Sequence, residues 1–345
     1  MENNAILKDL EDFTNTFPFF DEIKGSTFFI TGATGLVGST LVKCLYYANE
    51  KLDLNIKIIG LSRSKEKSEN EFKGYPKIKW IIQDMEDNFS FIDKVDYIIH
   101  AASPTQSRYL AEKPVEVLTE TINGANNIFR FGLSKEIKSI VYLSSIEMYG
   151  KNLDKSKLIE EDETFPLNPL SSRNSYPISK RAIECLAFGY FNEFGLPIKI
   201  VRLAQVIGPE AGQSDHRITM ELARAVTDNK DIVLRTNGES MHSYLYTIDA
   251  ANSILFALLK GKNGEAYNSA NIATYSSIKD LCYFVIKNFN PKIKLRFDID
   301  KDAPYPPNTF INIDSNKLID MGWKPKYNLR EIYQRVIHSL IAKRI

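Results

Sequence analysis

The sequence has 345 residues, of which 43% are apolar, and a formal net charge of +1. A chain of this length can bury a full core as one large domain or two interleaved ones, and its charge gives no reason to expect nucleic acid or an anionic membrane as a partner. Its three cysteines, Cys44, Cys185 and Cys282, are far apart and odd in number, so neither a disulfide framework nor a zinc site is predicted. The start lacks the pattern of a signal peptide, and no apolar run approaches the ~18 residues that a bilayer span needs. We therefore expect a cytoplasmic protein without a bound metal.

Residues 1–24 precede the first expected strand and carry apolar side chains at the spacing of a short amphipathic helix. We expect this extension to cover a sheet edge or to form an oligomer contact, which is a packing role.

Glycines stand three residues apart at Gly32, Gly35 and Gly38, between an apolar run (27–30) and a segment with helical apolar spacing (39–46). The order of strand, glycine turn and helix is typical of a dinucleotide phosphate site. Gly32 permits a sharp turn, Gly35 lets a pyrophosphate approach the backbone, and Gly38 lets helix and strand pack closely. The alternative is a purely structural turn, because any tight strand-to-helix turn can use glycine.

Three more strands are expected over residues 56–61, 78–82 and 96–99. Arg63 follows the first of them, at the position where an acidic residue would bond the cofactor ribose and an arginine accommodates the 2′-phosphate of NADP. Arg63 therefore favours NADP, unless it belongs only to the solvated basic run that it opens. The last strand leads into His100, Ala101, Ala102 and Ser103, whose small residues let a cofactor lie against the backbone. We expect His100 to order this turn.

The reacting centre is expected after a fifth strand, residues 139–143, which leads into Ser144, Ser145 and Glu147. Hydroxyl groups at the carboxyl end of a parallel strand face the crevice where ligands bind. Tyr176 and Lys180 follow at the i, i+4 spacing that places two side chains on one helix face. The lysine ammonium would lower the pKa of the Tyr176 phenol from its usual value of about 10 and suit it to general acid/base work.

The same spacing recurs by chance elsewhere, for example at Tyr283 and Lys287. Context selects Tyr176, because it follows a hydroxyl-bearing strand end, opens an expected helix and precedes another apolar strand at 198–201.

These motifs resemble those of the extended short-chain dehydrogenase/reductase superfamily, in particular its nucleotide-sugar epimerases, dehydratases and decarboxylases. The resemblance rests on four stretches: T-G-A-T-G-L-V-G at 31–38, H-A-A-S-P at 100–104, S-S-I-E-M-Y-G at 144–150 and Y-P-I-S-K at 176–180. It continues in R-L-A-Q-V-I-G-P at 202–209 and in the closing L-I-D-M-G-W-K-P at 318–325.

The resemblance implies roles for individual residues. Ser145, Tyr176, Lys180 and Glu147 are the expected catalytic residues, with Glu147 as a second acid/base or, alternatively, a structural acceptor. Asp84 is expected at the adenine amine, or else it only forms a turn. The expected cofactor contacts are Gly32, Thr34, Gly35, Leu36, Val37, Gly38, Arg63, Asp84, Met85, Ala101, Ala102, Ser103, Tyr176 and Lys180. The expected substrate contacts are Ser103, Ser145, Ile146, Glu147, Gln205, Arg217 and His242.

The sequence departs from the family pattern at several of these positions. Thr121 and Gln205 replace asparagines, and His242 stands where an arginine normally meets the substrate diphosphate. Ile146 replaces the aspartate of the dehydratases, whereas Glu147 distinguishes the chain from simple 4-epimerases. The resemblance therefore specifies the superfamily and its branch, and leaves the sugar open.

We predict an α/β protein with a Rossmann-type doubly wound parallel sheet and a smaller interleaved C-terminal substrate-binding domain. The expected parts are an N-terminal helical extension (1–24), an NAD(P)-binding domain (25–204, with a returning segment near 239–260) and a mainly substrate-binding part (205–345). The resemblance implies a homodimer built from helices near 114–134 and 176–194.

The expected function is that of an NAD(P)-dependent epimerase/dehydratase, which oxidises C4 of a nucleotide-activated sugar transiently to a 4-keto intermediate. Alternatives are a decarboxylase of the same superfamily, a net NADPH-dependent sugar reductase, or a non-catalytic cofactor-sensing protein.

Overall fold

The computed structural model describes residues 4–89, 94–212, 215–299 and 308–343. The helices within these ranges are α1 (Asn4–Thr16), α2 (Phe20–Ile23), α3 (Leu36–Leu52), α4 (Lys65–Glu71), α5 (Ser107–Glu112), α6 (Pro114–Ser134), α7 (Ser175–Phe194), α8 (Ile218–Asp228), α9 (Thr247–Lys260), α10 (Ile278–Phe289), α11 (Asn316–Asp320) and α12 (Leu329–Ala342), with the 3-10 turns η1 (Ile146–Tyr149) and η2 (Ser172–Asn174). The strands are β1 (Thr27–Thr31), β2 (Lys57–Ser62), β3 (Ile78–Ile82), β4 (Tyr97–His100), β5 (Ser139–Ser145), β6 (Leu158–Ile159), β7 (Ile198–Leu203), β8 (Gln205–Ile207), β9 (Ile232–Leu234), β10 (Met241–Tyr246), β11 (Ala266–Ser269), β12 (Asn271–Ser277), β13 (Leu295–Phe297) and β14 (Phe310–Ile313).

A seven-stranded parallel sheet forms the centre of the molecule, in the order β11-β7-β5-β4-β1-β2-β3. β1 lies between β2 and β4. The strand order therefore continues to β2 and β3 on one side of β1 and to β4, β5, β7 and β11 on the other. In such doubly wound sheets ligands bind where the strand order reverses, outside the carboxyl ends of the strands. The predicted fold class is confirmed, and the glycine turn after β1 lies at this switch point.

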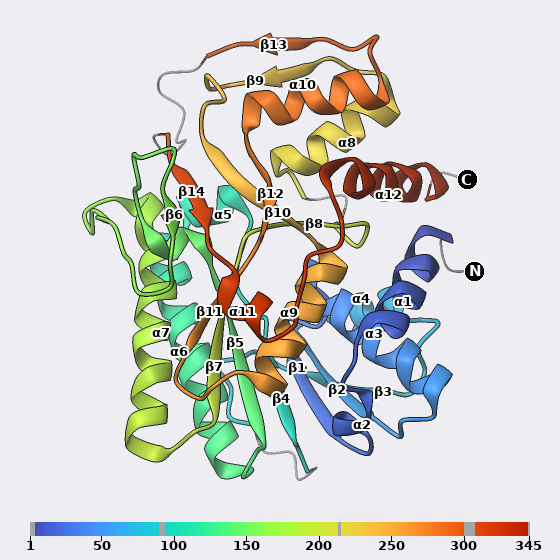
Figure 1. The fold of residues 1–345 in the computed structure, drawn as a ribbon. Helices are drawn as coiled ribbons and strands as arrows, with labels where there is room; N and C mark the ends of the chain where they lie inside the picture. Colours follow the sequence, from blue (N-terminus) through green and yellow to red (C-terminus); the bar gives the residue numbers. More distant parts are fainter. Residues whose placement is uncertain (1–3, 90–93, 213–214, 300–307, 344–345) are drawn as a thin grey trace.

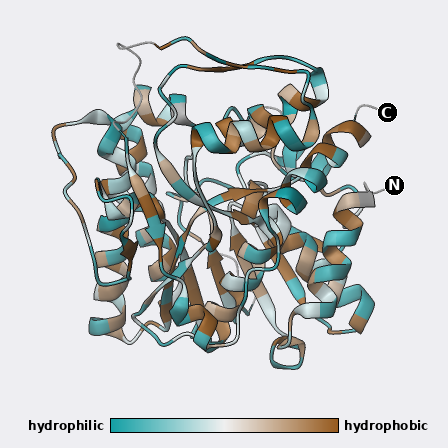
Figure 2. Ribbon diagram, turned by 45° about the horizontal axis from the view of Figure 1, so that its top comes forward, coloured by the Kyte–Doolittle hydropathy of each residue, from teal (hydrophilic) through white to brown (hydrophobic). Residues whose placement is uncertain are grey.

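Alternate residues of the central strands face two separate apolar layers. Phe28 and Ile99 belong to the layer under α3 and α9, whereas Phe29 and Ile98 belong to the layer under α6 and α7. Strands covered by helices on both faces are apolar throughout, as parallel sheets require. The hydrophobic residues accordingly follow the central strands, while the covering helices carry hydrophilic residues as well (Figure 2).

The second half of the chain builds a smaller region above the carboxyl edge of the main sheet (Figure 1). Its principal sheet has the order β12-β10-β14-β6, with β8 paired to β10, and β13 pairs with β9. The chain returns to the main sheet between these strands. α9 packs on β5 and β7, and β11 adds the seventh strand beside β7. The sequence led us to expect a return near 239–260 and did not indicate β11, which is only four residues long.

The N-terminal extension folds back against the body of the molecule. α1 packs against α3, α9 and α12, so the first and last helices lie side by side (Figure 1). Phe13 is fully buried and its ring stacks on Phe17 at a centroid distance of 5.5 Å. The extension is therefore part of the core. Throughout the described ranges, every helix is too short or too polar to cross a bilayer.

Candidate active site

The glycine turn after β1 is closed by backbone contacts that leave no room for side chains. Gly32 has a φ of +63°, which L-residues rarely adopt, and a Cβ at this position would lie 2.7 Å from the Ala102 nitrogen. A Cβ on Gly38 would lie 2.1 Å from the Gly32 carbonyl oxygen. Ala102 also donates its N–H to the Thr31 hydroxyl at 3.2 Å. The loop after β4 thus packs directly on the turn.

The turn presents an anion-binding surface. Gly35 is the exposed N-cap residue of α3 and has no side chain to cap the helix. Within the described residues, the first helical amides, those of Leu36 and Val37, have no hydrogen-bond partner. The buried hydroxyl oxygen of Ser103 is likewise unpaired in this part of the chain. Free amides at a helix N-terminus beside a Cβ-free cradle fit a dinucleotide pyrophosphate.

The expected adenosine contacts lie on the other side of the turn. The Arg63 side chain is exposed, and its charge acts on the Tyr109 phenol of α5. Asp84 accepts the Glu86 N–H at 3.0 Å, so the turn-forming alternative describes its present contacts. Met85 packs its side chain against Gly124 of α6.

His100 has a structural position at the end of β4. Its Nδ1 lies 2.8 Å from the Thr31 hydroxyl. Burial lowers the pKa of His100 to about 3, and the Lys180 charge acts in the same direction. The neutral imidazole of His100 thus joins β4 to β1. This contact is consistent with the ordering role that we expected from the sequence.

Ser145, Tyr176 and Lys180 come together at the carboxyl end of β5. Ser145 is the last residue of that strand, and its hydroxyl faces the Tyr176 phenol closely enough to lower the phenol's pKa. Lys180 Nζ lies 5.5 Å from the centroid of the Tyr176 ring and 4.9 Å from that of Tyr142. It donates to the Leu143 carbonyl at 2.8 Å. The i, i+4 spacing on α7 therefore places Tyr176 beside Lys180, and the end of β5 brings Ser145 to them.

The structure differs from the sequence-based expectation for the acidity of Tyr176. Burial raises the pKa of the Tyr176 phenol, and the Glu147 carboxylate adds to this effect, against Ser145, Arg173 and Arg217. Burial also lowers the pKa of Lys180 to about 7, against the opposing effects of Glu184 and Glu147. The pKa of Tyr176 is thus raised and not lowered as expected, because desolvation dominates, and Lys180 is not among the groups that oppose it.

Glu147 has a partner that the sequence did not reveal. Arg173, on η2, donates from Nη2 to the Glu147 carboxylate at 3.2 Å, and both side chains are partly exposed. The Glu147 N–H donates to the Ser145 hydroxyl at 3.2 Å. Arg173 and Glu147 therefore join two short turns beside Tyr176. Only the proximity of Arg173 to Tyr176 in the chain hinted at this contact.

A buried hydrogen-bond network begins at Glu184, whose charge acts on Lys180. Glu184 lies one helical turn beyond it on α7 and accepts bonds from Arg202 Nε at 3.1 Å and Nη2 at 2.7 Å. Arg202 Nη1 donates to the Tyr149 hydroxyl at 2.8 Å, which in turn donates to Asn268 at 2.6 Å. The network joins α7, β7, η1 and β11.

Three of the expected substrate residues come from the C-terminal half: Gln205 from β8, Arg217 from the start of α8 and His242 from β10. The charge of Arg217 acts to lower the pKa of Tyr176. The Arg217 guanidinium donates to Asp215 (Nη2 to Oδ2, 2.6 Å) and to the Val206 carbonyl (3.0 Å). Gln205 opens β8, which pairs with β10, the strand of His242. His242 Nδ1 is buried and unpaired among the described residues, and burial lowers the pKa of His242 to about 4.

Ile146 is an exception among these expected contacts. Its side chain is 1% exposed and belongs to the main core, so it packs behind the site. Any contact with a substrate would have to come from its backbone. The described residues contain no cluster of His, Cys, Asp and Glu side chains that could hold a metal ion.

Known proteins match the chain in sequence and in fold. The family model described as "NAD dependent epimerase/dehydratase family" matches residues 28–273. A UDP-glucuronic acid decarboxylase from Arabidopsis thaliana is 26% identical over 305 residues, which cover 88% of this chain and 85% of the relative. The human dTDP-D-glucose 4,6-dehydratase is 26% identical over 249 residues, covering 71% and 68% of the two chains.

A solved structure has the same fold. The dTDP-glucose 4,6-dehydratase of Streptomyces venezuelae, determined with NAD bound, superposes with a TM-score of 0.77 at 18% identity, covering 92% of this chain and 98% of that one.

The low pKa of Lys180 makes its charge a cost to folding. The unfolded chain holds a proton on this lysine up to about pH 10, whereas the folded chain releases it near pH 7. The charge therefore opposes folding below pH 7, and this penalty disappears as the pH rises towards 10. Lys180→Met lacks the penalty at every pH, whereas the wild type loses it as the pH rises. The unfolding free energy of the variant minus that of the wild type should therefore fall by on the order of 3 kcal/mol between pH 6 and pH 10.

Urea denaturation at a series of pH values measures this difference. Lys51→Met, at an exposed position of α3, is the control and should show no such trend. A Lys180→Met difference that stays constant with pH would contradict the assignment.

Proposed function

The chain belongs to the NAD dependent epimerase/dehydratase family, and on this premise we propose that it modifies a nucleotide-activated sugar by transient oxidation at C4. The observation that carries the proposal is the convergence of Ser145, Tyr176 and Lys180 beside the glycine turn, at the carboxyl ends of β1, β4 and β5. The relatives act, by their names, on UDP- and dTDP-linked sugars. We therefore infer the same class of substrate here.

Bound NAD or NADP would supply the hydride chemistry at C4 of the sugar. The residues that fit its phosphates are Gly35, Leu36 and Val37, with Ser103 at the loop after β4. The family is NAD-dependent. We propose a preference for NADP on the ground that the Arg63 guanidinium is exposed at the end of β2, where a 2′-phosphate would need a cation.

Tyr176 is the proposed base for the C4 hydroxyl, and Ser145 is the proposed orienting group. Tyr176 is 6% exposed, so a proton that it takes stays out of water. A protonated Lys180 favours the phenolate, which is the form that accepts the proton. Because the pKa of Lys180 is about 7, this assistance is sensitive to any charge that a ligand adds to the site.

Glu147 is the proposed second acid/base, acting on the carbon beside the ketone. Its carboxylate faces both Tyr176 and Lys180, and Arg173 holds it from the side. The 4-keto intermediate acidifies the neighbouring C–H, so one carboxylate suffices to move that proton. Arg217 is the proposed partner of the substrate diphosphate, because a guanidinium fork suits phosphate oxygens.

Other outcomes remain within the proposal. Decarboxylation would follow if the sugar carried a carboxylate. A net reduction would follow if the substrate already carried a keto group and NADPH, supplied as co-substrate, delivered its hydride to that carbonyl. A non-catalytic cofactor sensor is the alternative from another class.

We also propose a cytoplasmic homodimer through α6 and α7, where the exposed Phe188 and Phe194 extend the apolar surface of α7.

Removal of the Tyr176 hydroxyl tests the central proposal. Tyr176→Phe should lower kcat on UDP- or dTDP-sugars by about 10²- to 10⁴-fold, the usual contribution of a positioned acid/base. Binding of NAD and the melting temperature should change little, because the ring remains packed.

Tyr283→Phe is the matched control, since Tyr283 and Lys287 repeat the spacing on the exposed face of α10. Unchanged turnover in Tyr176→Phe would favour the cofactor-sensing alternative.

A second substitution tests the role of Glu147. In D₂O the wild type should introduce deuterium at the carbon beside C4, as detected by mass spectrometry of the recovered sugar. Glu147→Gln should slow this exchange by about 10²-fold, because the amide cannot take the proton. Glu50→Gln, at an exposed ion pair with Lys77, should exchange at the wild-type rate. Equal exchange in Glu147→Gln would identify Glu147 as a structural acceptor.

The cofactor preference has its own test. Arg63→Ala should weaken NADP binding by about tenfold, as expected for the loss of one charge-assisted contact, and leave NAD affinity within about twofold. Calorimetric titration with each dinucleotide gives both affinities. Lys65→Ala, in the same basic run, should leave both affinities unchanged. Equal effects of Arg63→Ala on the two dinucleotides would remove the preference.

A further inference from the structure

The first helix carries two carboxylates that are bound by the C-terminal half of the chain. Asp9 is 2% exposed and accepts bonds from the Tyr246 hydroxyl and from Arg335 Nη1. Asp12 accepts bonds from the Tyr327 hydroxyl at 2.9 Å and from Arg335 Nη2 at 2.8 Å. We call these five side chains the strap cluster.

The strap cluster is a closely packed polar contact. The Tyr246 and Tyr327 rings lie 4.7 Å apart, and the Arg335 guanidinium lies 4.7 Å from the Tyr327 ring and 5.9 Å from the Tyr246 ring. Arg335 thus bridges both carboxylates while stacked on aromatic faces. A buried charge with such a complete set of partners fixes the relative position of the elements that carry it.

One line of contacts runs from the strap cluster to Arg217 through strands. Tyr246 is the last residue of β10, which pairs in parallel with β8 through Leu245 with Val206 and Tyr246 with Ile207. The carbonyl of Val206 accepts a bond from Arg217 Nη1 at 3.0 Å. The strand that Asp9 holds is therefore the neighbour of the strand that holds Arg217.

A second line runs through helices. Arg335 belongs to α12, and on the same helix Tyr333 donates from its hydroxyl to the Thr219 carbonyl at 3.2 Å. Thr219 lies in the first turn of α8, for which Arg217 is the N-cap residue. Both lines therefore end at the backbone or the side chain of Arg217.

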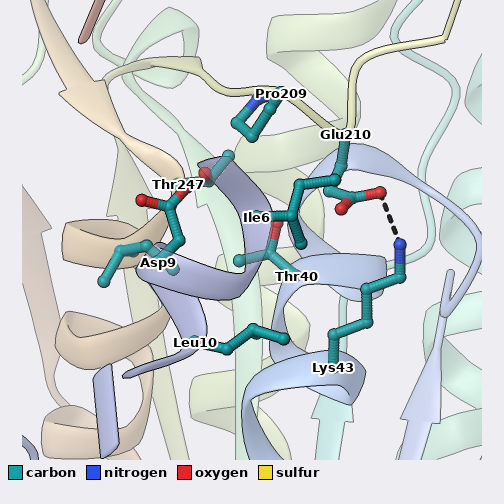
Figure 3. A pocket seen from close by; sticks show the side chains of 9 residues that line it. Ile6, Asp9, Leu10, Thr40, Lys43, Pro209, Glu210 and Thr247 are labelled. Carbon is teal, nitrogen blue, oxygen red and sulfur yellow. Dashed lines mark hydrogen bonds and ion pairs between the residues drawn. The ribbon is translucent and has the colours of Figure 1, made fainter. Parts of the chain in front are cut away.

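The face of α1 that carries Asp9 also carries Ile6 and Leu10, and it reaches the loop after β8. Ile6 and Leu10 point towards Thr40 and Lys43 of α3, and Lys43 donates to Glu210 at 2.7 Å (Figure 3). These side chains surround a cavity of about 10 Å³, room for a single water molecule. α1 is thus packed between α3, which begins at the glycine turn, and the loop that continues from β8.

The strap cluster lies partly outside the range that the family model matches. That range is 28–273, so it includes Tyr246 and leaves out both α1 and α12.

We propose that α1 is a positioning element for the substrate diphosphate, in which Asp9 and Asp12 act through Tyr246, Arg335 and α12 to hold Arg217 in place. The inference rests on the proposed function, because it takes Arg217 as the partner of the diphosphate. Asp9 and Asp12 are positioning residues that touch no substrate. Their effect should appear in the affinity for a nucleoside diphosphate and should be absent from the affinity for the dinucleotide.

The test compares ligand affinities of the full chain. Calorimetric titrations with UDP, dTDP and NAD are made on the wild type and on Asp9→Asn/Asp12→Asn. We expect the affinity for the nucleoside diphosphate that the wild type binds to fall by about tenfold, within the usual range of coupling between sites, while NAD affinity stays within about twofold. In an Arg217→Gln background the same pair of substitutions should have less than a twofold effect, because the residue through which they act is gone.

Glu22→Gln is the matched control. Glu22 also lies in the extension and pairs with Lys260 of α9 at 2.5 Å, away from both lines to Arg217, so all three affinities should remain unchanged. If the double variant does not fold, Asp12→Asn alone provides the test, since this carboxylate is only partly buried.

Three outcomes would overturn the inference: an unchanged nucleoside diphosphate affinity, an equal loss of NAD affinity, or a tenfold loss that persists in the Arg217→Gln background. A wild type that binds neither UDP nor dTDP would contradict the proposed function and remove this inference with it. A wild type that binds one of them, together with insensitive variants, would overturn the role of α1 alone.

Discussion

The ammonium of Lys180 is almost completely buried, and much of the active-site architecture compensates for that. Withdrawal of a charge from water costs several kcal/mol unless partners replace the lost hydration. Here the replacement consists of the Leu143 carbonyl, two aromatic rings and the Glu184 carboxylate, whose second partner is Arg202. The compensation is incomplete, since the pKa of Lys180 falls to about 7. The register of β5, α7 and β7 is consequently fixed by polar contacts as well as by the apolar layers.

The separation in sequence between contacting residues explains which parts of the molecule could be predicted from the sequence. The glycine turn, the strand ends and the tyrosine–lysine pair depend on neighbours a few residues away, so their spacing indicates their geometry. The acidity of Tyr176 could not be predicted in this way, because it depends on burial by distant segments. Arg173 was missed for a similar reason: its partner, Glu147, is 26 residues away. β11 is a short edge strand, and four residues carry too little periodicity to indicate it.

The two halves of the chain share their supporting elements. α9 packs on strands of the main sheet. β11, which lies between β10 and β12 in the chain, forms the edge strand of the main sheet beside β7. Asn268 of β11 accepts the Tyr149 hydroxyl, which connects this edge strand to the turn after Ser145. One continuous polar network therefore joins the turn after Ser145 to α7, β7 and β11. Because residues of this network come from both halves of the chain, the chain cannot be cut at one point into two independent domains without separating members of the network.

The contact between Asp9 and Arg335 spans 326 residues of chain, which has a consequence for synthesis on the ribosome. At about 5–20 residues per second, α1 emerges roughly 15–65 s before its partner helix is made. During that interval α1 can pack on α3, because the two helices are neighbours in sequence, but Asp9 lacks its counter-charge. Tyr246 also emerges well before Arg335. The nascent chain would thus hold a carboxylate that stays hydrated until α12 arrives, so closure of the first helix on the last is among the final events of folding.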